Sequence, residues 1–170
     1  MKNNFIYIII FLLFVNFESK SQLDTNQMSQ NTFYLEAGGI GGYGSFNYER
    51  IIPVKVNLKA GVTIGISTYK LTDYTTKFNP DIIIPISING LYGNNHKIEF
   101  GVGQTMSSII QIDHSNLKPI RIFNLHGNFK IGYRYQKDKG GIMFRCSYTP
   151  IIEFYRRYRH WAGISIGYAF

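Results

Sequence analysis

The sequence has little of what marks most catalytic and nucleic-acid-binding proteins. One cysteine, Cys146, occurs among 170 residues, so no disulfide can form within the chain. No Gly-x-Gly-x-x-Gly, P-loop or Cys-x-x-Cys motif occurs, and His126 and His160 have no metal-ligating partners at a useful spacing. The net charge of +8 is not gathered into a basic run with interleaved aromatic residues. We therefore expect no cofactor, no metal and no nucleic acid.

Long hydrophobic runs are also scarce. The longest, from Phe5 to Val15, has eleven residues, whereas a helix that spans a bilayer takes about 20. A lysine precedes this run, and the small-x-small step Ser19–Lys20–Ser21 follows it. This order is typical of a secretory signal peptide. The sequence predicts a signal peptide over 1–21 and a short polar lead over 22–31, with an uncleaved membrane anchor as the alternative.

Aromatic residues and glycine are plentiful, with 13 Tyr, 13 Phe and 17 Gly. Apolar and polar residues alternate repeatedly, as in the stretch NLHGNFKIGYRYQ at 124–136. A period of two is typical of a strand with one apolar face. Eight segments show it, and the sequence predicts β-strands at 32–40, 43–51, 54–67, 81–92, 97–110, 120–135, 141–149 and 160–170.

The connections between these segments alternate in length, apart from an expected tight hairpin at Gly41–Gly42. Short turns at one end and longer loops at the other are typical of an up-and-down transmembrane β-barrel. The fold class that the sequence predicts is therefore all-β, an eight-stranded antiparallel transmembrane barrel over 32–170. The short connections are expected at 52–53, 93–96 and 136–140, and the longer ones at 68–80, 111–119 and 150–160.

Alternation alone does not say which face is inside, and a soluble lipocalin-like barrel would turn the apolar face inward. The polar face is rich in glycine and small residues, which suits the crowded lumen of an eight-stranded barrel. We also expect an aromatic girdle on the apolar face at the short-turn end. Pro85 should mark a bulge, because proline cannot donate to a strand ladder. The expected girdle comprises Phe33, Tyr48, Tyr92, Phe100, Tyr133, Tyr135, Phe144, Tyr168 and Phe170.

The signal peptide, the eight segments, the unequal loops and the terminal Phe170 together resemble the small eight-stranded outer-membrane β-barrel proteins, of the OmpA transmembrane-domain and OmpX type. The stretch FYLEAGGIGGYGSFNYER looks like the opening hairpin of small outer-membrane proteins from Bacteroidetes. The resemblance implies the outer membrane of a Gram-negative bacterium. It also implies that Phe170 is recognised by the barrel-assembly machinery during insertion. It specifies no activity.

Charged residues of both signs fall on the face expected to line the lumen. Burying a single charge is costly, so we expect ion pairs that plug the barrel. A narrow gated ion path is the alternative, whereas eight strands leave too little room for a general porin. The expected network contains Glu36, Glu49, Glu99, Lys55, Lys59, Lys130, Arg134 and Arg145.

Two further stretches could carry chemistry at the loop end. Outer-membrane lipid A deacylases are eight-stranded barrels with a His and a Ser one residue apart; here His114 and Ser115 are adjacent, with Glu153 distant. Adjacent residues of a strand point to opposite faces, so a polar loop is the preferred interpretation, and His114 and Ser115 remain the alternative catalytic pair.

The second stretch, EFYRRYRHW at 153–161, carries Arg156, Arg157 and Arg159 among aromatic residues. Guanidinium groups suit the phosphates of lipopolysaccharide, and the alternative is general neutralisation of an anionic leaflet. The sequence thus predicts a monomeric, non-enzymatic outer-membrane barrel, structural or surface-binding through its loops. A membrane-embedded lipid hydrolase stays open as the other class.

Overall fold

The computed structural model describes residues 28–73, 75–113, 118–152 and 159–170. The expected signal peptide and most of the polar lead lie outside this part of the chain. In the part described, no helix is long and apolar enough to cross a membrane.

The alternating segments form strands because β-branched and aromatic side chains pack well on a pleated surface. A 3-10 helix, η2 (Gly39–Gly41), lies between the first two strands. The described strands are β1 (Asn31–Gly38), β2 (Gly44–Lys55), β3 (Leu58–Ser67), β4 (Ile82–Gly93), β5 (His96–Ile112), β6 (Pro119–Gln136), β7 (Gly141–Tyr148), β8 (Ile151–Ile152) and β9 (Ala162–Ala169).

All pairings are antiparallel and the sheet closes on itself. Its order is β5-β4-β3-β2-β1-β9-β7-β6, and β5 pairs with β6. The two-residue β8 continues β7 along β6 in an unbroken register, since Ile131 faces Tyr148 and Gly127 faces Ile152. Pro150 lies in the gap between them and has no N–H to donate. The prediction of a closed eight-stranded up-and-down barrel is therefore confirmed.

Two predicted turns are wrong. The tight hairpin expected at Gly41–Gly42 is a longer connection, because η2 lies between the end of β1 at Gly38 and the start of β2 at Gly44. The second is the turn after β2. Residues 52–53 continue β2, which runs to Lys55, and the turn lies at Val56–Asn57. Proline is tolerated here because the register between β2 and β3 shifts between Pro53 and Lys55, as at a β-bulge. Lys55, expected in the lumen, is exposed beside this turn.

The bulge that the sequence predicts at Pro85 does not form. Pro85 pairs with Thr105 of β5 in regular register. On the other side, the β3–β4 pairs Ile64–Ile86 and Ser67–Ile83 belong to one register, with no pair recorded between them. The ladder is interrupted without a shift, because the strand keeps its path where the proline N–H is missing.

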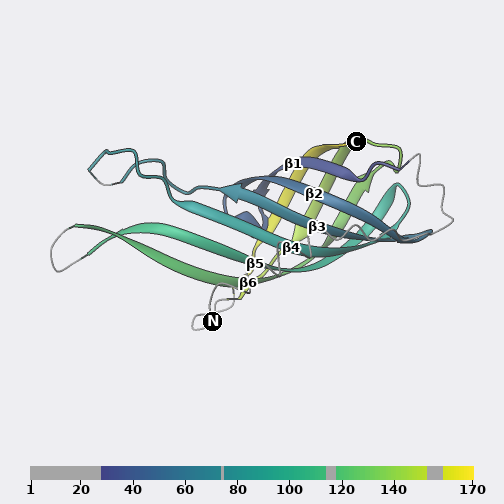
Figure 1. Ribbon diagram of the computed structural model, residues 1–170. Helices are drawn as coiled ribbons and strands as arrows, with labels where there is room; N and C mark the ends of the chain where they lie inside the picture. The colour runs from purple at the N-terminus through teal and green to yellow at the C-terminus, as the bar shows by residue number, and fades with distance from the viewer. Residues whose placement is uncertain (1–27, 74, 114–117, 153–158) are drawn as a thin grey trace, which may run out of the picture.

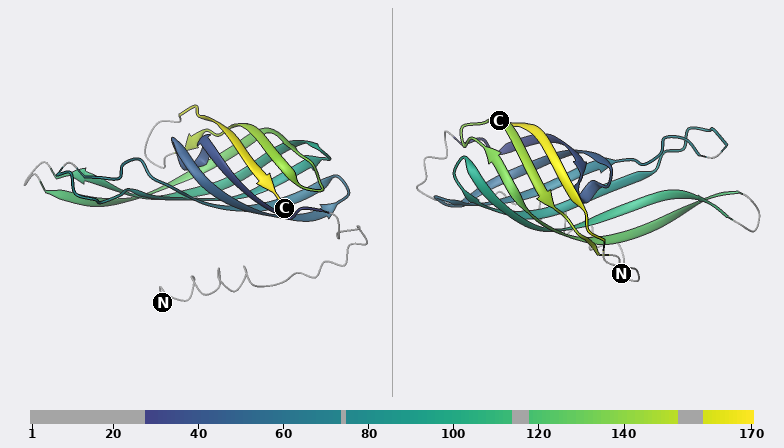
Figure 2. Two further views of the ribbon diagram at one scale, coloured as in Figure 1. Left: turned by 90° about the horizontal axis from the view of Figure 1, so that it is seen from above. Right: turned by 180° about the vertical axis from the view of Figure 1, so that it is seen from behind.

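The connections between strands are short at one end of the barrel and long at the other, as Figures 1 and 2 show. At one end the strands are joined by short turns. At the other, the β3–β4 connection (residues 68–81) and the β5–β6 hairpin project well past the rest of the barrel. The last pair between β4 and β5 is Ile82–Ser108. Beyond it, Ile109–Ile112 and Pro119–Ile122 pair with each other, and we call this projection the arm.

Candidate functional site: the lumen and the loop end

The centre of the lumen holds a network of buried ion pairs. The two guanidinium groups of β6 and β7, Arg134 and Arg145, are fully buried. Arg145 donates to Glu36 at 2.8 Å and to Glu99 at 3.2 Å, and its guanidinium lies 4.4 Å from the centroid of the Tyr34 ring. Arg134 pairs with Glu49. These side chains come from opposite walls, so they tie the barrel together across its axis.

Glu99 is the carboxylate that the cations share. Besides Arg145, it lies 2.7 Å from the ammonium of Lys130 and 3.6 Å from Arg134. Glu49 is held similarly, because it accepts hydrogen bonds from Asn89 at 2.8 Å and from Thr63 at 3.3 Å. The low dielectric of the lumen makes such pairs strong once formed and makes an unpaired member costly.

A second cluster closes the short-turn end. The carboxylate of Asp138, in the β6–β7 turn, accepts from Lys59 at 2.5 Å and lies 3.1 Å from Lys97. Lys97 also donates to the carbonyl of Gln136 at 2.5 Å. Partial burial would raise the pKa of Asp138, but the hydrogen bonds from Lys59 and Lys97 outweigh it and hold that pKa below its usual value. Sequence reasoning placed Lys59 in the lumen and missed Asp138 and Lys97.

The loop end is closed by backbone that turns inward. Ile40 of η2 is 5% exposed, and its carbonyl accepts a 2.8 Å hydrogen bond from Thr105 of β5. The turn requires glycine, since Gly38 has a φ of 76° and its missing Cβ would lie 2.2 Å from the carbonyl oxygen of Ala162. Tyr43 contacts Tyr69 and Trp161 above it, with ring centroids 5.4 and 5.9 Å apart. Ion-paired side chains thus occupy the centre of the lumen, and η2 and Asp138 occupy its two ends.

The outer face is apolar. The girdle aromatics are exposed or half-buried there, and Phe33 stacks on Phe46 and Phe170 with centroids 5.7 and 5.6 Å apart. Phe170 also exchanges backbone hydrogen bonds with Asn31 at 2.9 and 3.0 Å. Such a face, broad and apolar on every strand, suits lipid rather than water.

No family model matches the chain, and no curated protein matches it. Among solved structures, the N-terminal β-barrel domain of Pseudomonas aeruginosa OprF superposes with a TM-score of 0.57 at 10% identity, over 85% of this chain and 98% of that one. The Yersinia pestis outer membrane protein Ail, in a phospholipid bilayer nanodisc, gives 0.51 at 6% identity, over 84% and 99%. The chain has the fold of a small outer-membrane β-barrel. Identities this low carry the fold and no activity.

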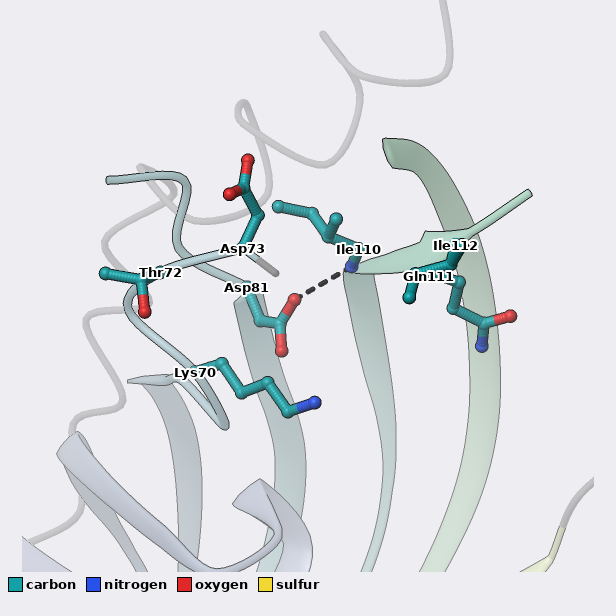
Figure 3. Close-up of a pocket in the computed structure, with 7 residues that line it drawn as sticks. All are labelled: Lys70, Thr72, Asp73, Asp81, Ile110, Gln111 and Ile112. Carbon is teal, nitrogen blue, oxygen red and sulfur yellow. Dashed lines mark hydrogen bonds between the residues drawn. The ribbon is translucent and has the colours of Figure 1, made fainter. Parts of the chain in front are cut away.

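The barrel's two projections are joined to each other. The carboxylate of Asp81, itself 6% exposed, accepts the backbone N–H of Ile110 at 2.8 Å. Arg121 of the arm donates to Asn79 at 2.6 Å and to the carbonyl of Pro80 at 3.2 Å. Figure 3 shows the pocket between them, about 300 Å³, with Asp73 and Asp81 on one side and β5 on the other.

The arm changes the chemistry of the inner face. Inside the barrel this face of β5 and β6 is polar, but in the arm Ile109 faces Ile122 and Gln111 faces Ile120. Over Pro119–Leu125, β6 has β5 as its strand neighbour, and the described β7 and β8 pairs begin only at Gly127. An apolar face beside a strand edge that no described strand covers is a surface suited to a partner chain.

Of the catalytic and lipopolysaccharide-contacting candidates, the structure describes Arg159 alone. His114, Ser115, Arg156 and Arg157 lie outside the described residues, whereas Arg159 is exposed. The N–H of Asp113 donates to the carbonyl of Lys118 at 3.0 Å, and the described part of the arm ends at this pair. In the described part of the chain, no three metal-ligating side chains gather.

Proposed function

We propose that the protein is a non-enzymatic outer-membrane barrel that works through its loop end, as a surface-binding or structural protein. The lipid-suited outer face, the aromatic girdle at the short-turn end and the fold it shares with OprF and Ail support the location. The basic residues of the loop end support contact with lipopolysaccharide phosphates, and Phe170 supports recognition during insertion.

The observation that carries the proposal is the contrast between a closed lumen and a projecting arm. A channel needs a path along the axis, but Glu99 and its cations fill the centre, while η2 and Asp138 occupy the two ends. The arm instead offers apolar side chains, and an edge of β6 that no described strand covers, to a partner in the medium. Strand addition to such an edge derives affinity from main-chain hydrogen bonds.

The location is tested by cell fractionation and by heat-modifiable mobility on a gel. We expect the protein in the outer-membrane fraction, with an unboiled form that runs differently from the boiled one. Purified barrel in a planar bilayer should conduct no steady current. Recovery as a soluble protein, or a steady open channel, would contradict the proposal.

The direction of the arm is tested on intact cells with a membrane-impermeant maleimide, in a Cys146→Ser background. An Ile120→Cys variant should be labelled, because Ile120 lies in the arm and is 41% exposed. Val56→Cys is the matched control, since Val56 is 69% exposed at the opposite, short-turn end. Labelling of Val56→Cys but not of Ile120→Cys would mean that the arm faces the periplasm.

A further inference from the structure

An apolar groove lies on the outer face of the barrel at its loop end, with a volume of about 550 Å³. Its floor comes from strands β1 to β4 and its overhanging wall from the β3–β4 connection. A volume of this size is typical of small-molecule sites. The groove, which we call the β3 groove, is lined by the apolar side chains of Leu35, Phe46, Ile66, Leu71, Phe78, Pro80 and Ile82.

The β3 groove has an unusual wall. Leu71 and Phe78 lie beyond the ends of β3 and β4, yet they are 59% and 78% exposed. They are brought beside Ile66 because the connection folds as a hairpin, with Thr72 bridged to Phe78. Apolar side chains that extend the lipid-facing surface past the strand ladder stabilise nothing while they face water. They gain free energy when a hydrocarbon chain covers them.

A positioned cation stands at the edge of this groove. Arg121 is exposed on the outer face of β6. Because β5 lies between β6 and β4, the backbones of these two strands are about 10 Å apart. Its guanidinium reaches back to the carbonyl of Pro80, which lines the groove, and is fixed there by Asn79 and by Ser108 Oγ at 3.1 Å. No described carboxylate forms an ion pair with Arg121.

We propose that the β3 groove and Arg121 form a binding site for one lipid A unit, the acylated and phosphorylated anchor of lipopolysaccharide. An acyl chain occupies the groove, and a phosphate lies against the positive charge of Arg121, whose Nη1 and Nη2 atoms already donate to Ser108, Asn79 and the Pro80 carbonyl. The planar guanidinium, already held in place, suits phosphate better than a mobile ammonium does. Lys70 and Lys77, exposed on the same connection, add attraction at longer range. The proposal rests on the proposed location in the outer membrane.

The commitment to a phosphorylated lipid follows from the order of chemistry along the barrel axis. Apolar side chains cover the outer face up to the overhang, and the cations begin at its rim. A partner protein's hydrophobic segment would need no phosphate, whereas a lipid anchored in the outer leaflet presents both groups at this depth. The girdle end differs, because the exposed cation there, Arg50, does not line the β3 groove.

The test uses barrel purified and refolded in detergent, with lipid A titrated and the bound lipid counted by native mass spectrometry. Arg121→Gln should weaken binding of bisphosphorylated lipid A roughly threefold to tenfold, as loss of charge-assisted hydrogen bonds at an exposed site predicts. Arg50→Gln is the matched control and should leave binding unchanged. Ile66→Trp, which fills the groove, should weaken binding, and Ile64→Trp, on the same face of β3 but outside the groove, should not.

Two lipid probes complete the test. Dephosphorylated lipid A should bind the parent about as weakly as bisphosphorylated lipid A binds Arg121→Gln. Phosphatidylglycerol, which has phosphate but a different anchor, should bind more weakly than lipid A. Equal losses in Arg121→Gln and Arg50→Gln, or equal binding of both lipid A forms, would overturn the site. Because refolded protein is used, these outcomes stand apart from fractionation, which tests the location.

Discussion

The two ends of this barrel differ in where their charged and apolar groups find partners. At the short-turn end, one carboxylate in a turn, Asp138, accepts from two buried lysines, and aromatic rings surround it on the outer face. At the loop end, β5 and β6 extend beyond the last β4–β5 pair, and apolar side chains are exposed. There Arg121 of the arm donates hydrogen bonds to the β3–β4 connection. At the first end the buried lysines Lys59 and Lys97 are matched inside the molecule. The second leaves apolar and basic groups whose partners must come from outside.

This difference indicates that the lumen contacts determine the stability of the barrel, whereas the loop end determines what it binds. Contacts in the lumen join opposite walls and cannot be removed one at a time without leaving a buried charge. The side-chain contacts of the arm join it to the β3–β4 connection and do not cross the lumen. We therefore expect substitutions in the lumen and at the η2 turn that closes it to destabilise the barrel. Substitutions in the arm and in the β3–β4 connection should change binding while the barrel persists.

The largest effect is expected for Glu99→Gln, which leaves Lys130, Arg134 and Arg145 short of their shared carboxylate. Breaking a buried ion pair by removing one partner costs about 3–5 kcal/mol. The measurement is the urea midpoint of the heat-modifiable form on a gel. Asp73→Asn, at the loop end, is the control and should leave the midpoint where it is. A midpoint unchanged in Glu99→Gln would mean that the network contributes nothing to stability.

A smaller loss is expected for Gly38→Ala. The residue has a φ of 76°, and the added Cβ would lie 2.2 Å from the carbonyl oxygen of Ala162. Strain of this kind costs about 1–3 kcal/mol. Gly44→Ala is the matched control, because the nearest atom to its added Cβ, the carbonyl oxygen of Glu36, is 3.7 Å away. If both variants unfold at the same urea concentration as the parent, the inward course of η2 is wrong.

The effect of Asp138→Asn should depend on pH. The folded pKa of Asp138 lies below its unfolded value, so its stabilisation is fully present above the unfolded value of about 3.9. It is lost as pH falls through the folded pKa. The urea midpoints of parent and variant should therefore differ at pH 7 and converge in strong acid. A constant difference across this range would show that the carboxylate charge is irrelevant.

The smallest effect is expected for the basic stretch at the loop end. Replacing Arg156, Arg157 and Arg159 with Gln should weaken lipopolysaccharide association by about 1 kcal/mol or less per residue. The loss should be larger at low salt, because exposed charges are screened. Vesicle binding at several salt concentrations measures it. Binding equal to the parent's at every salt would mean that these arginines are solvated surface, and failure of the barrel to fold would mean that the stretch belongs to a strand.

Much of the architecture could be predicted because a strand's faces follow from its sequence alone. Alternation put Glu36, Arg134 and Arg145 on the inner face, and all are buried. The turn after β2 could not be found this way. Pro53 looked like a terminator, but a bulge absorbs the missing donor, and the strand continues to Lys55.

The contacts that close the ends were harder, for a physical reason. Lys59 and Asp138 are 79 residues apart and meet only when the sheet closes. In the sequence, Asp138 lies between two lysines of a turn and is typical of a solvent-exposed residue. Its contact with Lys59 follows only from the closed barrel. The β3 groove could not be predicted for the same reason. Ile66 belongs to an alternating strand and Phe78 to the loop after it, and both line the groove because that loop folds as a hairpin.

The overrun of β5 and β6 has one more consequence. The wall made by β4, β5 and β6 stands higher than the wall made by β1 and β9, so the rim of the barrel is oblique (Figure 1). A barrel with a level rim looks alike from every direction in the membrane plane. An oblique rim gives this one a tall side and a short side, so a neighbour in the membrane plane meets a different surface according to the direction from which it approaches.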